Sequence, residues 1–102
     1  MRPIDVFPPA TPTNLGAITA AGVINLIWDP NVDPDLGGYV VLRSQDGGAT
    51  LLPLTRSAIP ENRFTDRNVT AGVQYTYEVR AVDMRVPVPN MSEAARVTET
   101  AR

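Results

Sequence analysis

Residues 74–82 read QYTYEVRAV and form the clearest structural pattern in the sequence. Its apolar and polar side chains alternate with the two-residue period of a β-strand that has one buried face. We therefore expect a strand with four residues facing a core: Tyr75, Tyr77, Val79 and Ala81. We expect three residues to face solvent: Thr76, Glu78 and Arg80.

Short apolar runs separated by turn residues extend this β pattern along the chain. They span residues 14–20, 23–28, 39–44, 50–54, 63–66 and 92–98. The second run ends at Asp29-Pro30, because proline lacks the N–H that a ladder needs. Asp46-Gly47-Gly48 predicts a tight hairpin, since its tip requires positive φ. Pro53 interrupts the fourth run and indicates a sheet edge.

The alternation in residues 23–28, 39–44 and 74–82 predicts one contiguous core. A register slip of one residue would expose the whole set. Its expected members are Ile24, Leu26, Trp28, Tyr39, Val41, Tyr77, Val79 and Ala81. No helical period lasts for more than one turn. The prediction is therefore an all-β, seven-stranded antiparallel sandwich of the immunoglobulin-like kind.

A chain of 102 residues has room for one domain with one core. Residues 1–12 hold four of the ten prolines and are interpreted as a proline-rich linker. The domain is expected to span residues 13–99, and a tail residues 100–102. Met1 followed directly by this linker favours a piece of a longer exported protein.

The composition excludes several classes of function. The chain has no histidine, so it has no imidazole base or histidine metal ligand. It has no cysteine, so it has no disulfide or thiolate nucleophile. The net charge of −2, without a basic patch, argues against nucleic acid as a partner. No apolar run approaches a membrane span, and no cofactor is expected.

Four acidic residues in the expected loops are the candidates for metal or acid chemistry: Asp29, Asp33, Asp35 and Asp83. Clustered carboxylates can bind Ca²⁺, and a pair of them can hydrolyse a glycoside. Their spacing matches no calcium loop, however, and aspartate beside proline or glycine is ordinary turn chemistry. We predict no metal site and no catalysis.

Local patterns in the chain resemble the fibronectin type III family. Residues 12–15 lead into a strand whose partner ends in Ile-Trp-Asp-Pro at 27–30. Residues 35–44 are similar to the third strand of bacterial repeats of this family, and residues 69–75 to its tyrosine corner. Residues 81–92 are similar to the way that the family enters its last strand. Together the motifs cover about residues 12–99.

The resemblance implies roles for two aromatic residues. Trp28 is expected in the core between the sheets, and the Tyr75 hydroxyl is expected to bond to the backbone between Val69 and Gly72. Ala71 stands where the family often has proline. Both roles are structural.

One loop stands out as a possible interaction surface, because it is apolar and stiffened by prolines. Residues 84–89 either fold down over the end of the sandwich or dock a neighbouring domain. The family topology brings the N-terminal segment to the same end. The candidate surface therefore comprises Phe7, Met84, Arg85, Val86 and Val88.

The resulting functional hypothesis is a non-catalytic spacer or protein-interaction module of a larger secreted or envelope protein, such as a bacterial lipoprotein. We expect it to be extracellular or in the cell envelope, to be a monomer in isolation, and to have neighbouring domains or another protein as partners. The alternative is an accessory domain that binds carbohydrate or peptide. Carbohydrate modules usually expose aromatic rings, whereas Trp28, Tyr39, Tyr75 and Tyr77 occupy inward positions.

Overall fold

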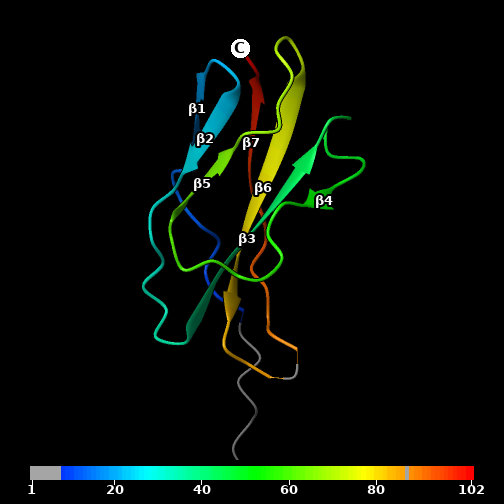
Figure 1. The fold of residues 1–102 in the computed structure, drawn as a ribbon. Coiled ribbons are helices and arrows are strands. Elements are labelled where there is room, and N and C mark those ends of the chain that lie inside the picture. The colour runs from blue at the N-terminus through cyan, green and yellow to red at the C-terminus, as the bar shows by residue number, and fades with distance from the viewer. Residues whose placement is uncertain (1–7, 87) are drawn as a thin grey trace, which may run out of the picture.

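The computed structural model describes residues 8–86 and 88–102, and in these ranges all the regular structure is β. The strands are β1 (Gly16–Ala20), β2 (Val23–Ile27), β3 (Leu36–Ser44), β4 (Leu52–Pro53), β5 (Arg63–Asp66), β6 (Gln74–Asp83) and β7 (Ala95–Thr100). They form two antiparallel sheets, β1-β2-β5 and β4-β3-β6-β7, as Figure 1 shows. The predicted seven-stranded antiparallel sandwich is confirmed.

The core lies between the two sheets and contains all eight predicted residues. Its buried members are Ile24, Leu26, Trp28, Tyr39, Val41, Tyr75, Tyr77, Val79, Ala81 and Ala101. Trp28 and Tyr39 meet edge to face, with ring centroids 5.2 Å apart. This geometry is favourable for two aromatic quadrupoles. The predicted register of the second, third and sixth strands is therefore correct.

The tyrosine corner is also present. The backbone N–H of Thr70 donates to the Tyr75 hydroxyl oxygen over 2.8 Å. The Arg43 guanidinium lies over the Tyr75 ring, 5.1 Å from its centroid. The hydroxyl thus fixes the connection from β5 to β6, as the sequence predicted.

The outer face of β6 differs from the prediction. Thr76 and Glu78 were expected to face solvent, yet they are only 3% exposed. β6 lies between β3 and β7, and side chains of β7 cover it from the outer side. Thr98 hydrogen-bonds to Thr76 and Arg96 pairs with Glu78. These polar residues of a central strand are buried because the side chains of Thr98 and Arg96 on β7 lie across them.

The last strand begins and ends later than predicted. β7 spans Ala95–Thr100, not residues 92–98, and Ala101 is in the core. Ala101 donates its N–H to Val73 O over 2.9 Å and accepts the N–H of Gly72 at 2.9 Å. The expected tail at 100–102 is therefore part of the packed domain. The alternation is weak in the sequence because Glu99, a charged residue, occupies one of the less exposed positions of β7.

β3 begins three residues earlier than expected, at Leu36, with an irregularity in its pairing to β6 between Leu36 and Gly38. A Cβ on Gly37 would lie 2.6 Å from the Asp83 carbonyl oxygen, so the approach of the two strands requires glycine there. β4 contracts to two residues at the sheet edge, in line with the interruption expected from Pro53.

Candidate interaction site at the N-terminal pole

One end of the sandwich, here called the N-terminal pole, carries three segments: residues 8–14, the β2–β3 loop (29–35) and the β6–β7 loop (84–90). The described chain begins at this end, and Figure 1 shows the C-terminus at the other. Among the described residues, four large apolar side chains of the β2–β3 and β6–β7 loops are exposed: Val32, Met84, Val86 and Val88. The candidate site is therefore built from loops, on a rigid scaffold.

The β6–β7 loop is held at its base by Asp83. This carboxylate accepts the Asn90 N–H at 2.8 Å, the Asn90 side-chain amide at 2.9 Å and the Arg85 N–H at 3.1 Å. Burial raises the pKa of the Asp83 carboxyl, but the bonds from Asn90 and Arg85 outweigh it and lower the pKa below the usual value. Asp83 is thus ionised at neutral pH and closes the loop as a compact unit.

The side chains of this loop do not fold down over the sandwich. Met84 is 61% exposed, Val86 83% and Val88 71%, and Arg85 is exposed as well. The interpretation in which the loop covers the end of the domain is wrong for these residues. Phe7, the remaining member of the predicted surface, lies outside the described residues.

The β2–β3 loop presents a further apolar side chain that the sequence analysis did not single out. Val32 is 96% exposed between Asn31 and Asp33. Nothing in a linear pattern separates an exposed loop valine from one that tucks under the sheet. Its neighbours Asn31 and Asp33 turn their polar side chains toward Ala10, to which both are hydrogen-bonded, and Val32 is left in solvent.

The four acidic candidates do not converge on one point. Asp29 accepts from Asn14, Asp33 from Ala10 N and Asn31, and Asp83 from Asn90 and Arg85. No group of three or more acidic side chains that could hold a metal ion occurs within residues 8–86 and 88–102. Asp29, Asp33 and Asp83 therefore hold the loops in shape, whereas Asp35 is exposed.

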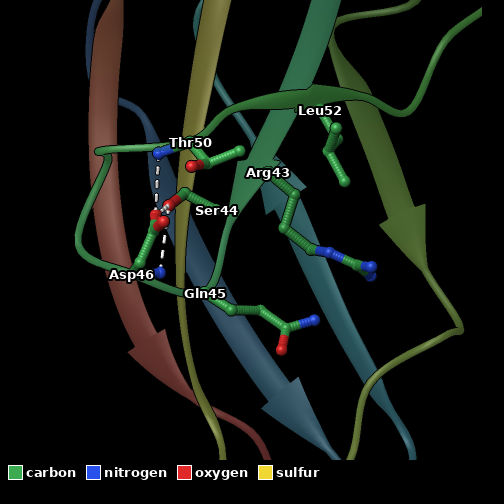
Figure 2. A pocket seen from close by; sticks show the side chains of 6 residues that line it. All are labelled: Arg43, Ser44, Gln45, Asp46, Thr50 and Leu52. Carbon is green, nitrogen blue, oxygen red and sulfur yellow. Dashed lines mark hydrogen bonds between the residues drawn. The ribbon is translucent and has the colours of Figure 1, made fainter.

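The hollow beside the β3–β4 turn is lined by polar groups, and Figure 2 shows how they lie. The Ser44 hydroxyl and the Thr50 N–H donate to Asp46, and these bonds lower the pKa of its carboxyl to about 2. Arg43 points away from Asp46 and pairs with Asp66 over 2.9 Å. Asp46 is thus committed to the turn, and the hollow offers no acid–base pair.

A buried polar network joins the two sheets. Asp66 on β5 is 3% exposed and accepts both the Tyr77 hydroxyl at 2.8 Å and Arg43. Burial and the bond to Asp66 raise the pKa of the Tyr77 hydroxyl. Arg43 also donates to Asn68 O over 3.0 Å. With its charge paired and its hydrogen bonds made, this cluster stabilises the sandwich and has no free reactive group.

A second hollow, which is shallow and apolar, lies on the outer face of the four-stranded sheet. It is lined by Val40, Leu42, Pro53, Thr55, Arg80 and Met91. Residues 39–42 form a continuous apolar run, so both faces of β3 are apolar there. Met91 is 49% exposed in this hollow, on a different side of the domain from the loop tips. Among the described residues, no segment covers it.

No helix long and apolar enough to span a bilayer occurs among the described residues. The chain matches no protein-family model.

The chain resembles a Fn3-like protein from Clostridium thermocellum in structure and in sequence. The two share 31% identity with a TM-score of 0.68, and the match covers 86% of this chain and 90% of the other. Since the match spans almost the whole of a Fn3-like protein, this chain belongs to the fibronectin type III-like family.

Two longer proteins contain similar stretches. Amylopullulanase of Thermoanaerobacterium saccharolyticum is 33% identical over 78% of this chain, and Exoglucanase B of Cellulomonas fimi is 35% identical over 92% of it. The chain spans only 6% and 8% of the length of these relatives. The likeness therefore concerns a small part of each enzyme.

Proposed function

We propose that the chain is a non-catalytic accessory module of a larger bacterial protein exported to the outside of the cell or its envelope, and that it spaces and joins domains there. One observation carries the proposal: a whole Fn3-like domain matches a small fraction of two enzymes named for hydrolysis of glucans. A domain that recurs as a short part of long enzymes is suited to position the other parts.

The side-chain chemistry supports a module without catalysis. The chain lacks histidine and cysteine. The most buried carboxylates, Asp66, Glu78 and Asp83, are each engaged by arginine, tyrosine or amide donors. A general acid in a glycosidase needs an unpaired carboxyl near a second one, and the carboxylates here are bonded to separate partners.

The surface that we assign to the module is the N-terminal pole, with Met84, Arg85, Val86 and Val88. Exposed apolar side chains on a loop with a fixed base resemble the centre of a small interface. We place Phe7 with this surface on the basis of the sequence, and the partner is a neighbouring domain or another protein.

Carbohydrate binding is the rival function. The only tryptophan and all three tyrosines of the chain are 2% exposed or less. Stacking on sugar rings needs an aromatic face in solvent, so these four residues cannot provide it. The rival therefore lacks an exposed tryptophan or tyrosine ring in the described part of the chain.

Retention on insoluble polysaccharide tests the proposal. The 102-residue chain is mixed with granular starch and with cellulose, and the protein left in the supernatant is measured with bovine albumin as the control. We expect all of the chain to stay in solution and no reducing sugar to be released. Saturable retention would favour the carbohydrate-binding alternative, and sugar release that depends on the chain would contradict the non-catalytic assignment.

A further inference from the structure

The proline-rich residues before β1 are strapped to the domain. Pro9 and Pro12 are buried. The Asn31 side-chain amide donates to Ala10 O over 2.7 Å, and Ala10 N–H donates to Asp33 over 3.3 Å. The sequence predicted a linker up to residue 12, but residues 8–14, here called the strap, are packed against the β2–β3 loop.

Two further bonds hold the end of the strap. The backbone N–H of Asp29 donates to Thr13 O over 2.9 Å, and the Asn14 side chain donates to the Asp29 carboxylate over 2.6 Å. Asn14 has φ of 58°, a left-handed conformation that asparagine tolerates better than most residues. The strap thus bends into β1 at a defined angle.

The strap is connected to the core through Asn31. The Asn31 backbone N–H donates to the Tyr39 hydroxyl over 2.6 Å, and Tyr39 is 1% exposed against Trp28. Asn31 therefore links a fully packed aromatic residue to the backbone of Ala10. Prolines in the strap add stiffness, because they fix φ.

The other end of the domain is held in the same manner. Ala101 is bonded to Val73 and Gly72, and Gly22 N–H donates to Arg102 O over 3.1 Å. β6 alone has ten residues, so its length of about 33 Å separates the two ends. Both ends of the described chain therefore have a fixed direction relative to the sandwich.

On these observations, and resting on the proposed function, we propose that the N-terminal pole is a rigid joint to the domain that precedes it in the same polypeptide. The strap sets the direction in which the chain approaches. Val32, from one loop, and Met84, Val86 and Val88, from the other, form the contact. The proposed partner is an apolar patch on a preceding domain, because the exposed side chains at the end where the strap enters the sandwich are apolar and this chain spans only 6% and 8% of two longer relatives.

The geometry explains why this contact needs little ordering. The β6–β7 loop is closed by Asp83, and the β2–β3 loop by Asn31 and Asp33. A surface that is already ordered loses less conformational entropy on association than a mobile one. A tethered partner also has a high effective concentration, so a small interface is sufficient.

A spin label on the strap tests the first half of the proposal in the chain itself. The protein has no cysteine, so Thr11→Cys gives one labelling site in the exposed part of the strap. We expect an immobilised spectrum in this protein and a several-fold shorter correlation time when Asn31→Ala is added. Asp35→Ala, an exposed residue in the same loop, is the matched control and leaves the spectrum unchanged.

Each possible result either supports or contradicts the role of the strap in setting the direction of the chain. Thermal melting checks whether the Asn31→Ala protein is folded at the temperature of the measurement. If it is not folded, Asp33→Ala replaces it: this variant removes the longer of the two bonds to Ala10 together with the bond between Asn31 and Asp33. A label that is already mobile without Asn31→Ala, or one that stays immobile with it, would overturn the strap as the element that sets direction.

Methionine oxidation tests the contact. Met84 is 61% exposed at the pole, whereas Met91 is 49% exposed on the outer sheet face, so Met91 is an internal control. Trypsin separates them, since Arg80, Arg85 and Arg96 flank the two peptides. Peroxide oxidation is followed by mass spectrometry in the 102-residue chain and in the longer natural polypeptide that includes the preceding domain.

We expect Met84 to react several-fold more slowly in the longer polypeptide and Met91 to react at the same rate in both. Equal rates for Met84, or a natural polypeptide without a preceding domain, would overturn the joint. Retention on polysaccharide, by contrast, would contradict the proposed function and leave the protection of Met84 as it is. The two proposals therefore fail in different experiments.

Discussion

Val41 and Val79 have no exposed surface in the core, whereas Val32 and Val86 at the N-terminal pole are 96% and 83% exposed. Full burial of a valine side chain stabilises a fold by about 1.5–3 kcal/mol. The two loop valines contribute none of this to the isolated domain. The same residue type therefore stabilises the fold in the core and remains available to a partner at the N-terminal pole.

The largest expected effect lies in the core. Trp28→Ala removes the residue that fills the space between the sheets, and we expect it to lower the free energy of unfolding by about 3–5 kcal/mol. Urea denaturation followed by circular dichroism measures this. Ile27→Ala is the control, because its side chain is 50% exposed on the outer face of β2. Similar losses for both variants would contradict the assignment of the core.

The tyrosine corner is expected to contribute less. Tyr75→Phe leaves the ring in place and removes the acceptor of the Thr70 N–H. We expect a loss of about 1 kcal/mol, the usual net value of one such hydrogen bond, with an unchanged circular dichroism spectrum. A melting temperature equal to that of the unmodified protein would show that the bond adds nothing to the connection between β5 and β6.

The β3–β4 turn should give a pH-dependent effect. The pKa of Asp46 is about 2 in the folded protein, below the ordinary value of 3.8. Stability from Asp46 is therefore complete above pH 4 and is lost as the pH falls toward 2. Asp46→Asn should flatten this part of the stability curve, measured by thermal melting between pH 5 and pH 2. An unchanged slope would mean that the turn does not hold the ionised carboxylate.

The smallest expected effect lies in the exposed loop. Val86→Ser combined with Val88→Ser should change the stability of the isolated chain by less than about 0.5 kcal/mol, because both side chains are already in water. Differential scanning calorimetry measures it. A larger loss of stability would show that Val86 and Val88 pack on the chain's own surface. These valines would then stabilise the isolated domain, as the core valines do.

Much of the fold could be predicted because alternation reports on burial wherever one face of a strand is covered. The predicted inward residues of β6 are all in the core. Glu78 shows the limit of the same pattern. It is correctly placed on the outer face, but its burial depends on Arg96, which comes 18 residues later and reaches across from β7. No local pattern in the sequence reports a contact between residues so far apart in the chain.

The candidate site was predictable only in part. The apolar, proline-stiffened loop after β6 could be recognised as unusual, but its exposure depends on Asp83 and Asn90 closing its base. Val32 had no sequence signal of its own. Residues 8–12 of the strap fall within the predicted proline-rich linker, because prolines exclude a strand and give no information on what the segment packs against.

Four properties of this protein could be predicted before its structure was known: the class of fold, the inward register of the central strands, the tyrosine corner and the lack of histidine and cysteine chemistry. The class of fold and the register follow from local periodicity and turn residues, the lack of histidine and cysteine chemistry follows from composition, and the tyrosine corner follows from the resemblance to the fibronectin type III family. The burial of Glu78, the place of Ala101 in the core and the bonds from Ala10 to Asn31 and Asp33 became apparent only in the folded structure. Each of these depends on residues that are far apart in the chain and are brought together only when the two sheets pack.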